Sequence, residues 1–474
     1  MEFRHVTSAI VDSLKEIVGG EFVFTDKETL CNYGHDETED LNFPPHVVIK
    51  PRVPEEISAV LKVCNAEKIP VTPRGAGTGL SGGALPVYGG ILISMERFNK
   101  IISIDERNLQ ATVEPGVINQ VFRDAAALKG LFYPPDPASR GSCFLGGNIA
   151  ENSGGPKAVK YGVTKDYVLN LEVVLPTGEI IQTGANVLKN STGYNLTQLM
   201  TGSEGTLGII TKIIFRLLPL PMYDMLMLVP FYSAIEACEA VTAIFRAGII
   251  PSALEFMEKD AIEWALKYMD TSTVSRQLLE ISAKNETAAH LLIEVDGNDR
   301  DTLIKDCEKI TETLANFKIG ETLFADTTEQ KNSIWKMRRS IGEVVKSHSV
   351  YKEEDTVVPR AELPKLLAGV KELGRKHGFH SVCYGHAGDG NLHVNIIKTG
   401  VSDEDWNNKI KYSIREIFKL CHILGGTISG EHGIGWVQKE YMDVVFPDIT
   451  RSIQKQIKSV FDPNGILNPG KIWT

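Results

Sequence analysis

The segment PRGAGTGLSGG, residues 73–83, constrains the fold more than any other part of the chain. Gly77, Gly79 and Gly82 have the spacing G-x-G-x-x-G, which in a Rossmann domain opens a helix whose N-terminus faces a pyrophosphate. Here the loop leads instead into ALPVYGGILISM, in which a proline and two glycines precede a β-branched strand. It also lacks the closing GKS or GKT of a Walker A motif. The chain is therefore not expected to bind NAD through this loop, nor a nucleotide through a P-loop.

The same loop is nevertheless suited to phosphate. Successive glycines let backbone N–H groups turn toward an anion without obstruction by Cβ atoms, and Arg74 adds positive charge. Two further segments rich in small residues follow, YPPDPASRGSCFLGGNIAENSGGPKAVKYGVT at 133–164 and GSEGTLGII at 202–210. Three stretches at which backbone can approach a ligand closely favour a large cofactor that carries phosphate groups.

The length of 474 residues predicts two or three domains. Glycine is frequent up to about residue 218, where the prolines of LLPLPM mark a junction. We expect a cofactor domain at 1–218, a cap domain at 219–425 and a C-terminal segment at 426–474 that returns to the cofactor site. Amphipathic helices are expected in the cap at 233–247 and 363–377. The fold class is α+β.

Composition excludes several classes of function. The formal net charge of −10 argues against a nucleic-acid partner, which requires clustered Lys and Arg. No transmembrane segment is expected, because the most apolar stretch, 207–232, is interrupted by charges and prolines and is typical of buried strands that flank a linker. The N-terminus has no signal-peptide core, and the seven cysteines form no CxxC pair. These features predict free thiols in a reducing compartment, with the cytoplasm as the expected location.

A second constraining feature is GHAGDGNLHVN at 385–395. The dipeptide Asp389-Gly390 favours a type I′ hairpin turn, in which both central residues take positive φ. A two-residue loop of this kind would pair Gly388 with Asn391 across the hairpin. Asp389 is therefore interpreted as a turn residue and not as a ligand.

That register would place His386 directly across from His393, with Cβ atoms about 4.5–5.5 Å apart, and Asn395 on the same face. Two surface histidines on a hairpin are the simple alternative. The segment SGEHGIGW at 429–436 adds a glutamate and a further histidine among glycines. Two histidines and Glu431 match a catalytic zinc site with open positions, and also the ligand set of non-haem Fe(II) oxygenases.

The motifs PRGxGTG, PPDP, GGNIAENSGG and GSEGTLGI, followed by the C-terminal FDPNGILNPGKI, closely resemble PCMH-type FAD enzymes, also called the vanillyl-alcohol oxidase type. The match extends over the whole chain. It implies a PCMH-type FAD-binding domain of two α+β subdomains, and an α+β cap with an antiparallel sheet. Members that attach FAD covalently through the first loop have a histidine near Thr78; this chain has none, so non-covalent FAD is expected. The residues expected to contact FAD are Arg74, Gly75, Ala76, Gly77, Thr78, Gly79, Ser81, Pro135, Asp136, Gly147, Asn148, Ser153, Gly154, Glu204, Gly208, Ile209 and Asn468.

Within these enzymes, HxGDGNLHxN and GEHGxG resemble the D-2-hydroxyacid dehydrogenase branch. The branch includes D-lactate dehydrogenases, D-2-hydroxyglutarate dehydrogenases and the flavin subunit of glycolate oxidase. The resemblance implies His386, His393 and Glu431 as ligands of a divalent metal, with zinc expected. It also implies His432 as the catalytic base and Asn395 as a substrate contact.

A cation must bind the carboxylate of such a substrate. The segment IWKMRRSIGE at 334–343 resembles the W-x-x-R segment of the branch, so Arg338 is the candidate, with a solvated helix face as the alternative. Arg339 is expected to point elsewhere. Lys352 matches loosely a second anchoring position of the enzymes that act on diacids. Gly342 stands where those enzymes have a hydroxyl residue, and this departure weakens the prediction of 2-hydroxyglutarate as the substrate.

The expected reaction is oxidation of a D-2-hydroxyacid of the D-lactate, glycolate or D-2-hydroxyglutarate class to the 2-oxoacid, with hydride passing to flavin N5. A metal bound by the substrate would lower the pKa of its hydroxyl, and a neutral imidazole would take the proton. The expected electron acceptor is a quinone, an electron-transfer flavoprotein or an iron–sulfur subunit, which could bring the chain to a membrane surface. The alternatives are an oxidase that uses O2 and a flavin subunit with a structural metal that is active only in a multisubunit complex. A homodimer is also compatible with the sequence.

Overall fold

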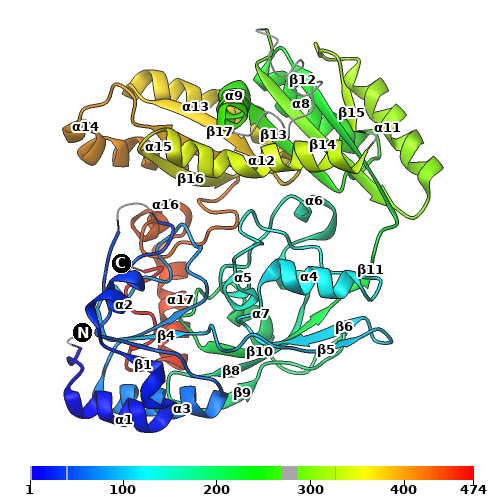
Figure 1. Ribbon diagram of the computed structural model, residues 1–474. Coiled ribbons are helices and arrows are strands. Elements are labelled where there is room, and N and C mark those ends of the chain that lie inside the picture. Colours follow the sequence, from blue (N-terminus) through cyan, green and yellow to red (C-terminus); the bar gives the residue numbers. More distant parts are fainter. Residues whose placement is uncertain (1–2, 39–40, 269–285, 326, 474) are drawn as a thin grey trace. The chain divides into compact units, whose positions relative to one another are not determined.

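The structure is a computed structural model, and it describes residues 3–38, 41–268, 286–325 and 327–473. The chain forms two compact units (Figure 1). The first unit consists of Met1–Gly154, Val163–Leu220 and Glu431–Thr474. The second consists of Gly155–Gly162 and Pro221–Gly430.

The chain passes between the units after Leu220 and after Gly430, whereas the sequence placed these boundaries after residues 218 and 425. The short excursion Gly155–Gly162 into the second unit was not expected. It lies inside a glycine-rich segment and includes the one-turn helix α6 (Ala158–Tyr161), so no change in composition marks it.

The first unit contains a four-stranded sheet of order β1-β2-β4-β3, in which β2, β4 and β3 are parallel and β1 is antiparallel. Its strands are β1 (Val23–Phe24), β2 (Val47–Ile49), β3 (Val71–Arg74) and β4 (Ile91–Ser94). Its helices are α1 (Ser8–Val18), α2 (Lys27–Asn32) and α3 (Pro54–Glu67). Pro54 begins α3, as its fixed φ favours, and the buried face of this helix packs with α1 against the strands.

The second sheet of the first unit is antiparallel, of order β5-β6-β10-β8-β9. Its strands are β5 (Ile101–Asp105), β6 (Gln110–Val113), β8 (Val168–Val174), β9 (Ile180–Gln182) and β10 (Ile209–Arg216). A separate pair joins β7 (Leu131–Phe132) to β11 (Leu218–Pro219). The helices of this part and of the C-terminal return are α4 (Asn119–Ala127), α5 (Leu145–Glu151), α7 (Leu196–Met200), α16 (Met442–Val445) and α17 (Asp448–Phe461).

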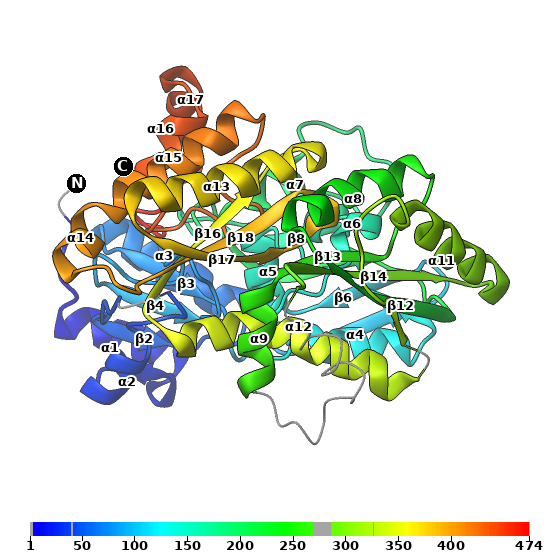
Figure 2. The ribbon, with the colours of Figure 1, turned by 90° about the horizontal axis from the view of Figure 1, so that it is seen from above.

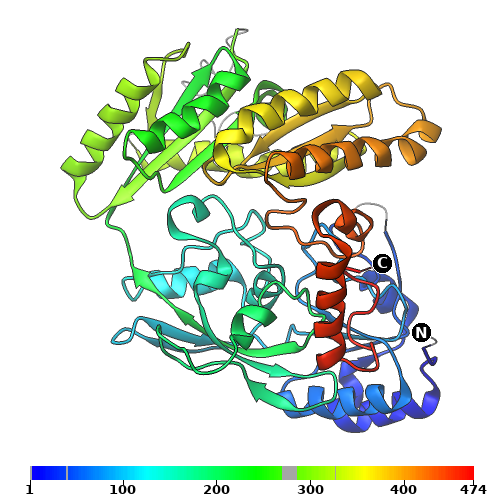
Figure 3. The same cartoon turned by 180° about the vertical axis from the view of Figure 1, so that it is seen from behind.

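Helix α17, drawn red in Figure 3, belongs to the first unit although it lies near the end of the chain. The Lys458 ammonium donates to the carbonyl of Thr206 at 2.7 Å, and the Val71 N–H donates to the carbonyl of Ile466 at 2.8 Å. These contacts join the C-terminal segment to the first and third of the glycine-rich segments.

The second unit is built on one antiparallel seven-stranded sheet of order β15-β12-β14-β13-β17-β18-β16. Its strands are β12 (Tyr223–Phe231), β13 (Ala253–Glu258), β14 (Ala289–Gly297), β15 (Leu323–Ala325), β16 (Tyr351–Val357), β17 (His380–Gly385) and β18 (Asn391–Ile397). The buried strands β10 and β12 confirm the interpretation of 207–232 as strands on either side of a linker.

Helices cover both faces of this sheet (Figure 2). One face has α8 (Ala234–Arg246), α11 (Arg300–Leu314), α13 (Leu363–His377), α14 (Asp403–Asn408) and α15 (Ile410–Ile423). The other has α9 (Lys259–Tyr268) and α12 (Thr328–His348). The ranges of α8 and α13 confirm the two amphipathic helices predicted in the cap.

One face of the seven-stranded sheet packs against α12, and this face carries the side chains of the candidate active site. Tyr351, Tyr384 and Ile397 belong to one buried cluster with Met337 and Ile341 of α12. Since directly paired strand residues share a face, the register assigns every side chain of β16, β17 and β18 to this face or to the opposite one. Among the described helices, none combines the length and apolar character needed to cross a membrane.

Candidate active site

The first glycine-rich loop begins where β3 ends, at Arg74. It runs to β4 with no intervening helix among the described residues, which confirms that it is not a Rossmann loop. Gly77 has φ +75°, and a Cβ there would lie 2.1 Å from Nη2 of Arg74, so the loop turns closely around the guanidinium. A Cβ on Gly75 would lie 3.8 Å from the backbone N of Gly147. The first loop, which also contains the predicted FAD contacts Ala76 and Thr78, therefore meets the second loop within the first unit.

Two glycines of these loops have no structural reason to be glycine. A Cβ on Gly79 or Gly147 would meet no described atom within 4 Å, and neither residue has a positive φ. Nearby, Arg74 Nη1, Ser81 Oγ and Asn148 Nδ2 are buried without a hydrogen-bond partner in the described part of the chain. Buried polar atoms without partners are uncommon in proteins, because each costs desolvation energy. Bare backbone beside such atoms fits a polar cofactor such as FAD.

Other predicted FAD contacts have partners within the protein. Asp136 is 1% exposed and pairs with Arg140 at 3.3 Å and Arg123 at 3.8 Å, and the Pro135 carbonyl accepts from Asn119 Nδ2 at 3.3 Å. The PPDP motif is thereby fixed by its own neighbours. This geometry neither requires nor blocks a cofactor contact.

The third segment is also tied to the protein. The Glu204 carboxylate was predicted to be near FAD, but it accepts from the N–H of Ile434 at 2.8 Å and of Gly435 at 2.6 Å. It therefore holds the turn of the GEHGIG motif. Gly208 is explained by packing, since a Cβ there would lie 2.3 Å from Val173 Cγ1, and Ile209 pairs with Val174 in the sheet.

The C-terminal segment locks these loops together. Asn468, in a left-handed conformation with φ +43°, donates its amide to the carbonyls of Gly83 at 3.0 Å and Glu204 at 2.8 Å. In the second loop, Thr164 donates to the Ser153 carbonyl at 2.7 Å. The Gly154 N–H donates to Glu431 Oε2 at 3.1 Å. The GEHGIG turn is thus held by two of the cofactor loops.

In the second unit, the turn of the GHAGDGNLHVN segment differs from the predicted hairpin. The connection spans five residues and not two: β17 ends at Gly385, a 3-10 turn covers Ala387–Asp389, and β18 begins at Asn391. Gly390 takes a positive φ of +76°, while Asp389 does not. A type I′ turn needs positive φ at both central residues, so the two-residue loop was a wrong prediction.

The register shifts as a result. His393 pairs with Tyr384, and His386 lies in the turn itself, with φ −85° and ψ +77°. The two imidazoles nevertheless meet, with ring centroids 5.4 Å apart and an interplanar angle of 83°. They are 8% and 4% exposed, so they are not the surface histidines of the simple alternative.

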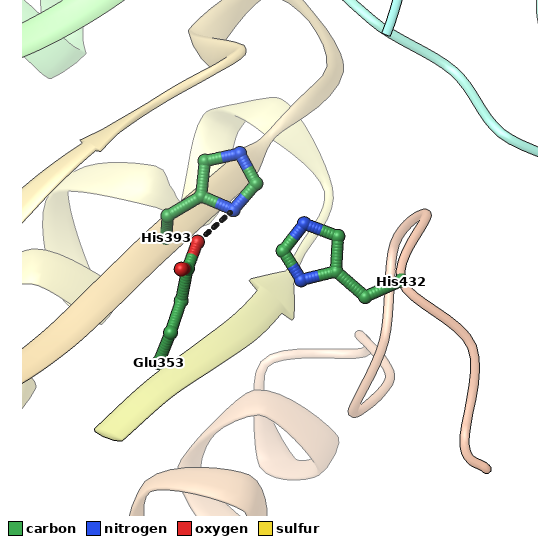
Figure 4. Close-up of side chains that lie close together, drawn as sticks. All are labelled: Glu353, His393 and His432. Carbon is green, nitrogen blue, oxygen red and sulfur yellow. Dashed lines mark ion pairs between the residues drawn. The ribbon is translucent and has the colours of Figure 1, made fainter. Parts of the chain in front are cut away.

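Both imidazoles face carboxylates through Nδ1. His386 Nδ1 lies 2.9 Å from each oxygen of Glu255. His393 Nδ1 faces Glu353, at 3.5 Å from Oε1 (Figure 4). It also lies 3.6 Å from Asp355 Oδ1. At His386 the contact is a hydrogen bond, which favours the tautomer in which Nε2 carries the lone pair, whereas at His393 the carboxylates lie at ion-pair distance. This is the arrangement by which metal-binding histidines are usually oriented.

Arg338 lies beside the same carboxylate. Its Nη2 is 2.6 Å from Glu255 Oε2, and its guanidinium carbon is 5.2 Å from the centre of the Tyr384 ring. At 5% exposure it is buried, which excludes the alternative of a solvated helix face. Its Nε has no partner among the described residues, so a donor is available to a ligand. The guanidinium of Arg339 lies instead over the ring of Trp335, with Cζ 4.6 Å from the ring centre.

The strand register separates the remaining candidates. Asn395 pairs with Glu353 and Val382 and shares the face of His393; its Oδ1 is buried without a partner in the part of the chain that the structure describes. Lys352 pairs with Ile396 and therefore points to the opposite face of the sheet. The structure does not bring Lys352 to this group, so its predicted role as a substrate contact is not supported.

Three carboxylates at this site were missed from the sequence: Glu255, Glu353 and Asp355. An acid inside the apolar strand ALEFME was the available signal for Glu255, which is 0% exposed. Burial by itself would raise its pKa, but the charges of His386 and Arg338 hold the pKa of Glu255 below its ordinary value.

Asp355 anchors the end of this unit. Its Oδ2 accepts from the N–H of Gly430 at 2.8 Å, and Gly430 is the last residue of the second unit. Glu431 and His432 follow in the chain and belong to the first unit. Of the predicted metal ligands, His386 and His393 therefore belong to the second unit and Glu431 to the first.

Comparisons with known proteins identify the family of the chain. The model of an FAD binding domain matches residues 45–184, and the model described as FAD linked oxidases, C-terminal domain, matches residues 220–472. The chain is 37% identical to a D-lactate dehydrogenase of Anaerostipes hadrus over 99% of this chain and 98% of the relative. It is 37% identical to the glycolate oxidase subunit GlcD of Bacillus subtilis (99% and 97%) and 31% identical to a D-2-hydroxyglutarate dehydrogenase of Stutzerimonas stutzeri (98% and 99%).

Solved structures with the same fold include 4-ethylphenol oxidase from Gulosibacter chungangensis, with a TM-score of 0.77 at 19% identity and coverage of 100% and 99% of the two chains. The structure of p-cresol methylhydroxylase with substrate bound gives a TM-score of 0.77 at 19% identity, with coverage of 99% and 98%. The expected PCMH-type α+β fold is confirmed. The chain therefore belongs to the family of FAD-linked oxidases and is an FAD-dependent oxidoreductase of the group that contains D-lactate dehydrogenases, the glycolate oxidase subunit GlcD and D-2-hydroxyglutarate dehydrogenases.

Proposed function

We propose that this protein oxidises a small D-2-hydroxyacid to the corresponding 2-oxoacid, with FAD and a divalent metal, zinc being the expected ion. The substrate classes in question are D-lactate, glycolate and D-2-hydroxyglutarate, which are those of the named relatives. The single observation that carries the proposal is the pair of buried imidazoles, His386 and His393, each with a carboxylate at Nδ1. Such a pair suits two neutral nitrogen ligands of one ion.

The proposal assigns the metal to His386, His393 and Glu431. Glu431 and His432 enter on the strength of the sequence motif. A divalent ion held there would supply Lewis acidity that lowers the pKa of a substrate hydroxyl. FAD, when bound, supplies the two-electron acceptor.

The remaining steps belong to the protein's own side chains. Arg338 binds the substrate carboxylate through its donors, since a guanidinium matches the geometry of a carboxylate. Asn395 offers the unpartnered Oδ1 as an acceptor on the face of His393. His432, as a neutral imidazole, accepts the hydroxyl proton. We expect a quinone, an electron-transfer flavoprotein or an iron–sulfur subunit to receive the electrons.

The test is anaerobic reduction of the flavin. The purified protein, loaded with FAD and zinc, is mixed with D-lactate, glycolate or D-2-hydroxyglutarate, and the flavin absorbance is followed without oxygen. Bleaching with at least one of the three is the expected result. No bleaching with any hydroxyacid, despite bound FAD and zinc, contradicts the proposal. Reoxidation by air at a rate equal to that with an artificial acceptor would favour an oxidase.

Variants separate metal binding from chemistry. His386→Ala should abolish bleaching and reduce zinc content while the FAD spectrum is retained. The matched control is His380→Ala, a change of an exposed histidine at the start of β17 that pairs with Asp260. Replacing His432 by Ala should leave zinc content unchanged and stop flavin reduction. Loss of FAD in the His386 variant would show that the residue has been assigned to the wrong site.

A further inference from the structure

One buried carboxylate contacts both halves of the proposed substrate site. Glu255 lies on β13 and is 0% exposed. Its Oε1 and Oε2 are each 2.9 Å from His386 Nδ1, and Oε2 is also 2.6 Å from Arg338 Nη2. His386 comes from the turn after β17, whereas Arg338 comes from α12. A single side chain therefore touches two elements that are far apart in the sequence.

The surroundings leave the two partners little freedom. A Cβ on Gly388 would lie 2.4 Å from Val159 Cγ2, so the turn that carries His386 packs closely against α6. The Arg338 guanidinium lies over the Tyr384 ring. Close packing limits both side chains to few rotamers, and the Glu255 carboxylate then selects among them.

We propose that Glu255 is a positioning residue that couples metal binding to substrate binding: it orients the His386 imidazole for the metal and the Arg338 guanidinium for the substrate carboxylate. This inference rests on the function proposed above. The carboxylate accepts a hydrogen bond from the Nδ1–H of His386, so the lone pair of the imidazole is on Nε2. It also binds one edge of the guanidinium, while Arg338 Nε has no partner among the described residues.

This arrangement makes a specific demand on the carboxylate. Glu255 has only two oxygens, and both are within 2.9 Å of His386 Nδ1. In Glu255→Gln, one of the two oxygens becomes an NH2 group, which donates and cannot accept, so it would face the Nδ1–H donor of His386. The variant also removes the negative charge opposite Arg338, although it keeps the volume of the side chain.

The same strand offers a matched control. Glu258 lies three residues further along β13, so its side chain is on the other face of the strand. Its Oε2 accepts from the Lys371 ammonium at 2.8 Å and from the Cys383 N–H at 2.7 Å. Glu258→Gln removes a mostly buried, ion-paired carboxylate from the same strand without touching His386 or Arg338.

The experiment compares the two variants in the FAD-bound protein. Zinc is removed with a chelator, and its affinity is then measured by competition with a chromophoric zinc indicator. We expect Glu255→Gln to bind zinc about 10- to 100-fold more weakly than the parent, and Glu258→Gln to stay within about twofold of it. At saturating zinc, Glu255→Gln should also raise the KM for the hydroxyacid that reduces the flavin, about tenfold or more. The reason is that the variant no longer orients the Arg338 guanidinium toward the substrate carboxylate.

The outcomes separate this inference from the function on which it rests. If His386→Ala loses zinc but Glu255→Gln binds zinc and substrate like the parent, the coupling role is wrong while the proposed metal site stands. If His386→Ala retains zinc, the metal assignment itself fails. Retention of FAD and an unchanged melting temperature show that a variant is folded. Should Glu255→Gln not fold, Glu255→Asp replaces it, and its shorter side chain should weaken zinc binding if the inference holds.

Discussion

The two units prepare for their ligands in different ways. In the first unit, the cofactor loops present bare backbone, since a Cβ on Gly79 or Gly147 would meet no described atom within 4 Å. In the second unit, the candidate site is made of side chains, and each one is held by another, as Glu255 holds His386 and Arg338. A site made of backbone tolerates substitutions of the surrounding side chains, but it does not tolerate a Cβ atom on the glycines that face the ligand. A site made of side chains depends on the sheet register and on every partner.

The largest expected effect tests how far the second unit depends on paired side chains. Lys157 forms ion pairs with Glu294 and, at 3.6 Å, with Asp296, and both carboxylates are buried. Lys157→Met should lower the free energy of unfolding by about 3–5 kcal/mol, because it leaves the buried carboxylate of Glu294 without its cation, while Asp296 keeps Lys160. Urea titration followed by circular dichroism measures the loss. Lys129→Met, which breaks an exposed pair with Glu106 in the first unit, should cause no measurable change.

The next effect concerns the turn that carries His386. Gly390 has φ +76°, and a Cβ would lie 1.9 Å from the Val358 carbonyl oxygen. Gly390→Ala should cost about 3 kcal/mol in unfolding free energy, from backbone strain together with overpacking. Gly378→Ala provides the control, since this residue also has positive φ (+77°) but no described atom lies within 4 Å of its Cβ position. It should cost about 1 kcal/mol. Equal losses for the two variants would refute the packing argument.

A third effect concerns His290, a buried histidine without, in the described part of the chain, a neighbouring carboxylate of the kind that His386 and His393 have. Among the residues that the structure describes, neither ring nitrogen of His290 has a hydrogen-bond partner, and burial lowers the pKa of His290 to about 4. As the pH falls from about 6.5, the unfolded chain binds a proton that the folded chain does not bind, so stability falls. The parent should therefore lose stability between pH 7.5 and 5.

Replacing His290 by Leu should reduce that loss by about 2 kcal/mol at pH 5, since each pH unit between the two pKa values is worth about 1.4 kcal/mol. Urea titrations at both pH values measure it. The matched control is the corresponding change at His377, an exposed histidine in the last turn of α13. A His290 variant with the same acid sensitivity as the parent would show that this side chain is not its source.

The smallest effect on stability is expected in the first unit, where a change can lower FAD affinity without lowering the free energy of unfolding. Gly147→Ala adds a Cβ that meets no described atom, so the free energy of unfolding of the FAD-free protein should change by less than about 0.5 kcal/mol. FAD affinity should fall about tenfold or more, because the Cβ intrudes on the space left for the cofactor. Fluorescence titration with FAD measures it. Unchanged affinity would mean that Gly147 does not face the cofactor.

The same contrast explains how much could be predicted from the sequence. Glycine loops and helix ranges such as α8 and α13 depend on local residue patterns, and they were predicted correctly. Side-chain sites depend on strand register, which long-range pairing decides. A difference of one residue in register moves a side chain to the other face. Lys352 was predicted as a substrate contact from its place in the sequence alone, but its pairing with Ile396 puts it on the face opposite His393.

His386 and His393 lie close together although the predicted pairing across the hairpin was wrong, because His393 pairs with Tyr384 and His386 approaches its ring from the turn. Glu255 was missed for a different reason. A single acid in an apolar strand carries no information about its partners, which come from elements 80 or more residues away in the sequence, at Arg338 and His386. Long-range partners of this kind appear only when the sheet is assembled.

The excursion Gly155–Gly162 has a consequence for modularity. Because it leaves and re-enters the first unit, the chain crosses between the units after residues 154, 162, 220 and 430, and no single cut separates them. A fragment that ends at Leu220 would carry Lys157 and Lys160 without Glu294 and Asp296. The two units are therefore not independent modules. Recombination that exchanges the second unit between relatives must exchange this octapeptide with it, because otherwise buried carboxylates of the second unit lose their cations.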